Sequence, residues 1–211
     1  TAYEIMPSLV GSEMCIRDSN MKEEIVELDV GAVILSPGFE EFDPSVIPYL
    51  GYRKYPNVVT SIEFERMLSA SGPYEGKLVR PSDGKPPRRI AWIQCVGSRD
   101  ASCNRDYCSS VCCTYAIKQA IVAKEHVPHE IDETIFFMDM RTQGKGFERF
   151  YERGKEEGIK FVRAKVYQVE EVDETGELSV RYLDEDGGVK KAQFDLVVLS
   201  VGFQPSEEVI K

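Results

Sequence analysis

Short apolar runs that alternate with helical patterns limit most strongly how this chain of 211 residues can fold. RIAWIQCV, TIFFMDM and IKFVRAKVYQVEEV have the length and the β-branched and aromatic content of buried strands. Between them lie SSVCCTYAIKQAIVAKEH and FERFYERGKEEG, which have the patterns of helices. The order strand, helix, strand, helix, strand predicts an α/β unit with a parallel sheet.

Further elements flank this unit on both sides. SIEFERMLSA predicts a short helix capped by Thr60 or Ser61. GELSVRYLDEDGGVKKAQFDLVVLSVGFQPS predicts antiparallel strands that turn at DEDGG, the last of which ends at Val201-Gly202-Phe203. Two strands, GAVILSPGF and LVVLSVGF, end alike in a glycine turn on either side of the α/β unit. They fit the exit and return strands of nested dinucleotide-binding folds. They fit equally well two ordinary buried strands that stop at glycine.

Composition and charge exclude several classes of partner. The net charge is −10 without a basic stripe, which argues against nucleic acid and anionic membranes. No apolar run approaches the roughly 18 residues of a membrane span, so we expect a chain that does not span a membrane. No secretory signal is visible, which predicts a cytoplasmic protein whose clustered cysteines bind metal or do redox work.

The first 19 residues do not fit the pattern that follows them. PSLVGSEMCIRDS resembles translated adapter sequence found at the ends of environmental assemblies. We therefore expect residues 1–19 to be a non-native segment and leave Cys15 out of the functional site.

The stretch from Cys95 to Cys113 holds five of the six cysteines. A disulfide framework does not suit a reducing compartment, and a bridge between the adjacent Cys112 and Cys113 would be strained. Structural zinc sites use paired C-x2-4-C knuckles, which this stretch lacks. An iron–sulfur cluster with four thiolate ligands fits better. Simple buried thiols remain the other alternative.

The spacing Cys95-x12-Cys108-x3-Cys112-Cys113 suggests how four thiolates could converge. If the helix begins near Cys108, then Cys108, Cys112 and Cys113 fan out from one helix end, and Cys95 closes over them from the preceding strand. The helix N-terminus favours the negative charge of such a group. In the same place a nucleotide-binding domain would carry G-x-G-x-x-G, and CVGSRD stands there instead, so we expect no pyridine nucleotide.

At this point the sequence resembles a known family. YPNVVTSIEFERMLSASGPYEGKLVRPSDGKPPRRIAWIQCVGSRD, YCSSVCCTYAIKQA, TIFFMDMRTQGKGFERFYERGKEEGIKFVRAKVY and FDLVVLSVGFQPSEE together resemble the A subunit of heterodisulfide reductase, over residues 21–211. The resemblance implies an oxidoreductase with a thioredoxin-reductase-like fold, in which nested dinucleotide-binding folds form three layers with an antiparallel meander. It also implies a [4Fe–4S] cluster on Cys95, Cys108, Cys112 and Cys113, with Cys103 as a bystander.

The resemblance also implies the organisation of the chain and its partners. Residues 20–86 would end the first part of an FAD-binding domain and add a connector, residues 87–165 would form an inserted NAD(P)-domain-like module with the cluster, and residues 166–211 would form the meander and the return strand. The complete protein would pass electrons from FAD through clusters to other heterodisulfide reductase-type subunits, with a hydrogenase or dehydrogenase as donor, in a hetero-oligomer. We expect this chain to be a central fragment that is inactive alone.

Flavin contacts are predicted at the two glycine turns and on the cysteine-bearing helix. The turns are Ser36, Pro37 and Gly38 and Ser200, Val201 and Gly202, and Lys118 would place a cation near the flavin ring. A solvated helix lysine explains Lys118 equally well. Two other functions remain open, namely a zinc-bound or metal-free module that docks partner subunits and an NAD(P)H-dependent disulfide reductase.

Overall fold

The computed structural model describes residues 27–34, 36, 38–172 and 175–205, and it divides at residues 36 and 37 into two units. In the first unit, the described residues are exposed and contain no helix or strand. The strand predicted over GAVILSPGF is therefore wrong for residues 31–34. An extended apolar segment becomes a strand only where a neighbouring strand pairs with its backbone groups, and residues 27–34 have no such partner among the described residues. The predicted adapter segment lies outside these ranges.

A five-stranded parallel sheet forms the centre of the second unit, in the order β2-β9-β3-β4-β5. Its strands are β2 Val58–Thr60, β3 Arg89–Val96, β4 Asp132–Phe137, β5 Lys160–Arg163 and β9 Leu196–Val201. Every residue of β9 is buried, as expected for a continuous apolar run inside a parallel sheet. The predicted α/β class is confirmed. The antiparallel arrangement predicted for the strand that ends at Val201 is wrong, because β9 runs parallel to both of its neighbours, β2 and β3.

Three helices cover one face of this sheet. They are α3 Ser61–Leu68, α4 Cys112–Ala123 and α5 Phe147–Glu156. Thr60 caps α3 in a capping box with Glu63, in which each side chain bonds to the backbone N–H of the other residue. Apolar side chains of the three helices and of alternate sheet residues form one core cluster around the fully buried Trp92.

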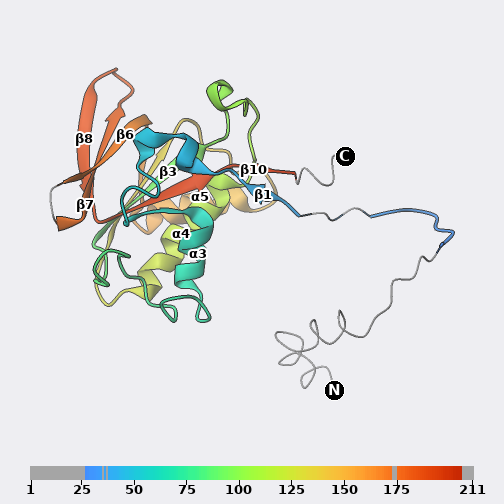
Figure 1. Cartoon of the computed structure of the whole chain (residues 1–211), viewed down its shortest axis with the longest axis horizontal. Helices are drawn as coiled ribbons and strands as arrows, with labels where there is room; N and C mark the ends of the chain where they lie inside the picture. Colours follow the sequence, from blue (N-terminus) through green and yellow to red (C-terminus); the bar gives the residue numbers. More distant parts are fainter. Residues whose placement is uncertain (1–26, 35, 37, 173–174, 206–211) are drawn as a thin grey trace. The chain divides into compact units, whose positions relative to one another are not determined.

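An antiparallel meander covers the other face (Figure 1). Its strands are β6 Lys165–Val172, β7 Glu177–Leu183 and β8 Val189–Phe194, joined in the order β6-β7-β8. The single strand predicted over IKFVRAKVYQVEEV is wrong, because the chain leaves the parallel sheet at Ala164 and enters the meander. The backbone of β5 pairs with β4, whereas the backbone of β6 pairs with β7, so the pairing partner changes at Ala164 and one straight strand could not make both sets of hydrogen bonds.

Short elements complete the second unit. They are the two-stranded ribbon of β1 Glu40–Glu41 and β10 Phe203–Gln204, and the 3-10 helices η1 Pro44–Val46, η2 Pro48–Leu50, η3 Ala101–Cys103 and η4 Lys124–His126. The sheet takes β2 from predicted segment 20–86, β3 to β5 from 87–165 and β9 from 166–211, so these three segments share one sheet. The domain boundaries themselves stay a prediction. No helix in the described part of the chain is long and apolar enough to cross a membrane.

The amino end of β4 holds a buried carboxyl group. The side chain of Glu133 is 1% exposed, and neither of its oxygens has a hydrogen-bond partner within the described ranges. Burial raises the pKa of Glu133 to about 8, and Glu157 adds to this rise. Lys124 Nζ, 3.4 Å from Oε2, opposes the rise without cancelling it. Burial therefore dominates over the ion pair at this position.

We expect Glu133 to make the stability of this fold depend on pH. Because its pKa is higher in the folded than in the unfolded chain, the free energy of unfolding falls as the pH rises from about 4.5 to about 8, by up to about 5 kcal/mol. Glu133→Gln should remove this fall, as measured by urea unfolding at pH 5, 6.5 and 8.5. Asp132→Asn, at an exposed carboxylate one residue away, is the control. Parallel pH profiles of wild type and Glu133→Gln would contradict this assignment.

Candidate iron–sulfur site

The four predicted ligand cysteines lie where β3 ends and α4 begins, at the carboxyl end of the sheet. Cys95 sits in β3 at a bulge, since the register between β3 and β9 shifts between Ile93 and Val96. Its φ angle is 62°, which is uncommon for a residue other than glycine. Because a bulge changes the direction of the side chain at that point, the backbone itself aims the Cys95 thiol.

The helix starts later than predicted. Cys108 precedes α4, and Ser110 has a left-handed φ of 62°, so the hypothesis of a helix start near Cys108 is wrong. Tertiary hydrogen bonds fix this turn: Ser109 N–H donates to Ser98 Oγ at 3.1 Å, and Phe203 N–H donates to Ser109 Oγ at 3.0 Å. Cys112 and Cys113 therefore occupy the first turn of the helix, and Cys108 approaches from a loop.

These four thiols are near enough to influence one another. Burial raises the pKa of Cys95 and Cys113, and raises that of Cys112 to about 12. Beyond burial, electrostatic interactions that raise these pKa values connect every pair among Cys95, Cys108, Cys112 and Cys113. The structure thus brings together the four cysteines that the spacing singled out.

Cys103 lies apart from this group. Its Sγ is 3.8 Å from Ser102 Oγ in η3, and its side chain packs against the meander-side core. Its side chain interacts electrostatically with Tyr49 and forms a hydrogen bond with Asp100. This position agrees with the role of a bystander, which stays a prediction.

The four thiols do not converge on one point. Among the described residues, no group of three or more His, Cys, Asp or Glu side chains is placed to hold a single metal ion. In a [4Fe–4S] cluster each cysteine binds a different iron, so its ligands surround the cluster without meeting at one ion.

Hydrogen-bond donors and cations surround the thiols. Ser110 N–H donates to Cys108 Sγ at 3.3 Å. Asp139, after β4, pairs with both Arg99 and Arg141, at 2.9 Å from Arg141 Nε. Both arginines lower the pKa of Cys113, against the larger effect of burial. Together with the start of α4, these groups favour negative charge on sulfur.

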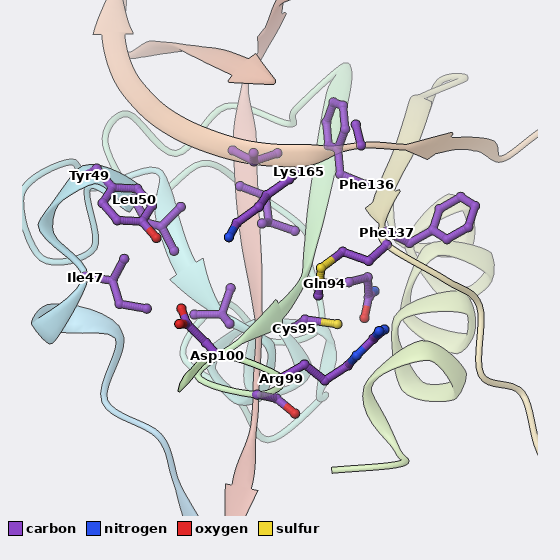
Figure 2. Close-up of a pocket in the computed structure, with 16 residues that line it drawn as sticks. Ile47, Tyr49, Leu50, Gln94, Cys95, Arg99, Asp100, Phe136, Phe137 and Lys165 are labelled. Carbon is purple, nitrogen blue, oxygen red and sulfur yellow. The ribbon is translucent and has the colours of Figure 1, made fainter. Parts of the chain in front are cut away.

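A small cavity lies behind Cys95, between the ends of β3 and β4, η2 and the start of β6 (Figure 2). Figure 2 shows the side chains of Gln94, Cys95 and Arg99 extending to the same side, away from Ile47 and Tyr49. The cavity volume is about 60 Å³. Pockets for small ligands usually have about 300–1,000 Å³, so this place is too small for a nucleotide.

A larger apolar groove opens beside the cysteine-bearing turn. It has about 540 Å³ and is lined by residues from the start of α4 and from α5, with Tyr115, Phe147 and Phe150 among them. Lys118 and Lys145 also line it, and Lys118 forms an ion pair with Glu65 of α3. Aromatic rings with two lysines suit a planar, anionic group.

The other predicted flavin contacts have different surroundings. Ser200 and Val201 are fully buried in β9, and Gly202 follows them. Gly38 has a positive φ of 76°. Ser36 belongs to the first unit and is exposed, and Pro37 lies outside the described residues. Flavin contacts at all six positions stay predictions.

Two residues of the site, Gln94 and Arg99, are not among those predicted from the sequence. Gln94 is a polar residue in an otherwise apolar strand directly before Cys95, which is a signal visible in the sequence. Arg99 joins the site through a left-handed φ of 58° and its ion pair with Asp139 of another strand end. No local pattern gives that pairing.

The fold and site define an α/β protein in which a cysteine-bearing turn occupies the usual place of the nucleotide-binding turn. No family model matches the chain. Curated proteins do match. One is an iron–sulfur A subunit of the CoB–CoM heterodisulfide reductase of Methanopyrus kandleri, to which the chain is 50% identical over 192 residues. This alignment covers 90% of this chain and 29% of that protein. It is 42% identical over 202 residues to the A subunit of the H2:CoB–CoM heterodisulfide,ferredoxin reductase of Methanothermobacter thermautotrophicus, covering 92% of this chain and 30% of that protein.

A third relative is the A subunit of the ferredoxin/F420H2-dependent CoB–CoM heterodisulfide reductase of Methanosarcina acetivorans, 41% identical over 90% of this chain and 24% of that protein. The chain belongs to the family of heterodisulfide reductase A subunits, as predicted from the sequence. It spans less than a third of the length of these three relatives.

Solved structures with a similar fold are thioredoxin reductases. The Lactococcus lactis enzyme aligns over 82% of this chain and 45% of its own, with a TM-score of 0.49 and 15% identity. The T. acidophilum enzyme aligns over 80% of this chain and 43% of its own, with a TM-score of 0.46 and 15% identity.

We expect the Gly202→Ala substitution to destabilise the sheet end that carries the site. A Cβ at Gly202 would lie 2.5 Å from the Gly97 carbonyl oxygen and 3.1 Å from Ser109 Oγ, and the carbonyl belongs to backbone that cannot easily move. The free energy of unfolding should fall by about 1–3 kcal/mol in urea titrations. Gly31→Ala, whose added methyl meets no atom within 4 Å, is the matched control. Equal unfolding midpoints for the two variants would contradict this view of the contact.

Proposed function

We propose that this chain is the cluster-binding part of an electron-transfer flavoprotein of the heterodisulfide reductase type. Cys95, Cys108, Cys112 and Cys113 would hold a [4Fe–4S] cluster between the end of β3 and the start of α4. When bound, such a cluster accepts and releases single electrons. The observation that carries this proposal is the placement of these four thiols together, at the bulged end of β3, in the loop before α4 and in the first turn of α4.

The residues around the cysteines support this choice over the alternatives. The start of α4, Arg99 and Arg141 would offset the negative charge of four thiolates. A structural zinc site usually needs two C-x2-4-C pairs, one from each of two turns, and the stretch from Cys95 to Cys113 does not contain two separate pairs with that spacing. For a nucleotide-dependent reductase the cavity behind Cys95 is too small, and CVGSRD lacks the glycines that a pyrophosphate needs.

In the complete cytoplasmic protein, we infer that FAD lies near the groove beside α4. The Lys118 ammonium and the aromatic groove wall would face the flavin there, because positive charge stabilises a reduced flavin. The names of the relatives mention ferredoxin, H2, F420H2 and the CoB–CoM heterodisulfide. We infer that the complete protein passes electrons from FAD through this site to partner subunits, toward a disulfide or ferredoxin.

Anaerobic reconstitution of the chain with iron and sulfide tests the cluster. We expect a brown protein with about four iron and four sulfide per chain and broad charge-transfer absorbance. Cys112→Ser should lose most of the bound iron, because Cys112 begins α4 and is electrostatically coupled to the other three thiols. Iron and sulfide analysis with visible absorbance measures both results.

Cys103→Ser is the matched control, since it removes a thiol from the same stretch but outside the coupled group. It should keep the full iron and sulfide content. Loss of the cluster in Cys103→Ser to the same extent as in Cys112→Ser would refute the ligand assignment. Binding of one zinc per chain without charge-transfer absorbance would refute the cluster.

A further inference from the structure

Gln94 is buried without a partner. Gln94 is 8% exposed, and neither its Nε2 nor its Oε1 atom has a hydrogen-bond partner among the residues that the structure describes. Leaving a buried amide unpaired costs free energy, and native proteins rarely do so without a reason. A ligand that supplies the missing partner is one such reason.

The position of Gln94 on the strand directs it toward the first turn of α4. Side chains alternate along β3, so Gln94 shares a face with Trp92, whose Nε1 donates to Gln119 Oε1 of α4 at 3.3 Å. Two strand residues advance about 6.6 Å, which equals about four to five helix residues at 1.5 Å each. Since α4 runs back antiparallel to β3, Gln94 lies level with Thr114 and Tyr115, in the helix turn that begins at Cys112.

A second buried polar residue lies near the end of the neighbouring strand β9. Ile93 of β3 pairs in register with Leu199 of β9, and the register shifts directly after this pair, before Val96 pairs with Val201. Ser200, the residue after Leu199, is fully buried, and its side chain interacts with the Tyr115 hydroxyl of α4. Ser200 therefore has a neighbour in α4 to interact with, whereas the Gln94 amide has no hydrogen-bond partner among the described residues.

Gln119 is a second buried glutamine between the sheet and α4, and its hydrogen bonds allow a comparison with Gln94. It is 2% exposed in the same layer between sheet and helix, yet its amide is fully engaged. Nε2 donates to the Ser61 carbonyl at 2.8 Å and to Glu65 Oε2 at 3.2 Å, and Oε1 accepts from Trp92. The fold therefore supplies partners to one buried glutamine and leaves the other, next to the cysteines, unpaired.

We propose that Gln94 donates a hydrogen bond from Nε2 to a sulfur of the cluster held by the four cysteines, and thereby raises its reduction potential. This inference rests on the proposed function. The partial positive charge of an N–H donor stabilises the state that carries one more electron, and hydrogen bonds to sulfur are among the groups that set cluster potentials. No covalent bond forms or breaks at Gln94, which acts only as a positioning and tuning residue.

Gln94→Met tests this role, because methionine keeps nearly the same volume but has no N–H donor. In the reconstituted chain, an EPR-monitored redox titration should show a lower potential, with reduction up to about tenfold less favourable, which is 59 mV for one electron. In the chain without cluster, the urea midpoint should stay equal or rise, since an unpaired amide has been removed. Gln119→Met, the matched control, should lower that midpoint and leave the potential unchanged.

The outcomes separate this inference from the proposed function. A wild-type chain that binds no cluster would refute the proposed function, and this inference with it. A wild-type chain with a cluster whose potential is the same in Gln94→Met would refute only the role of Gln94. A loss of stability of the cluster-free chain in Gln94→Met as large as in Gln119→Met would also overturn it, because Gln94 would then serve the fold.

Discussion

The hydrogen bond from Gly202 N–H to the Val96 carbonyl, 2.7 Å long, joins the ends of β9 and β3, and the site depends on it. The Gly202 carbonyl in turn accepts from Phe42 N–H at 2.9 Å. Because β9 inserts between β2 and β3, this one junction connects segments that lie more than 150 residues apart in the chain. Cys112 Sγ lies 3.7 Å from the Val201 carbonyl at the same junction, so β9 also fixes the start of α4.

The same junction fills the space beside the turn that follows β3. In a dinucleotide-binding turn, glycines let the backbone approach the pyrophosphate. Gly97 stands at the corresponding turn with a φ of 65°, but a Cβ built on it would lie 2.1 Å from the ring of Phe42. The glycine thus makes room for an aromatic side chain of the protein. The turn keeps its sharp geometry, and it presents the Cys95 side chain, instead of a series of backbone N–H groups, near the start of α4.

Much of the fold follows from local sequence patterns, and the exceptions have physical causes. The buried strands, the helices and the cap at Thr60 are predicted because periodicity and capping chemistry are local. The late start of α4 is not predictable, because the Ser109 backbone and hydroxyl are held by Ser98 and Phe203 from distant turns. The break at Ala164 has a similar cause, since the backbone pairs with β4 before it and with β7 after it.

The site also has one part that local sequence predicts and another part that it does not. Cysteine spacing singles out four thiols that the structure brings together, because their separation in sequence matches one strand end, one loop and one helix start. The groups around them come from other strands, so Arg99 meets Asp139 only through the tertiary fold. Local sequence therefore indicates the ligand set, while the charges and donors that surround it depend on sheet order.

Buried polar groups that lack hydrogen-bond partners occur at both ends of this sheet, and they differ in whether a change of protonation can lower the cost of burial. Glu133, at the amino end of β4, has Lys124 at 3.4 Å, and it can relieve its burial by holding a proton. Gln94, at the carboxyl end, does not titrate and has no such relief. An unpaired carboxyl group can thus persist at a free-energy cost that depends on pH, whereas the cost of an unpaired amide is removed only by a hydrogen-bond partner. The carboxyl end of a parallel sheet is where α/β folds place their ligands, and the unpaired amide of Gln94 lies at that end.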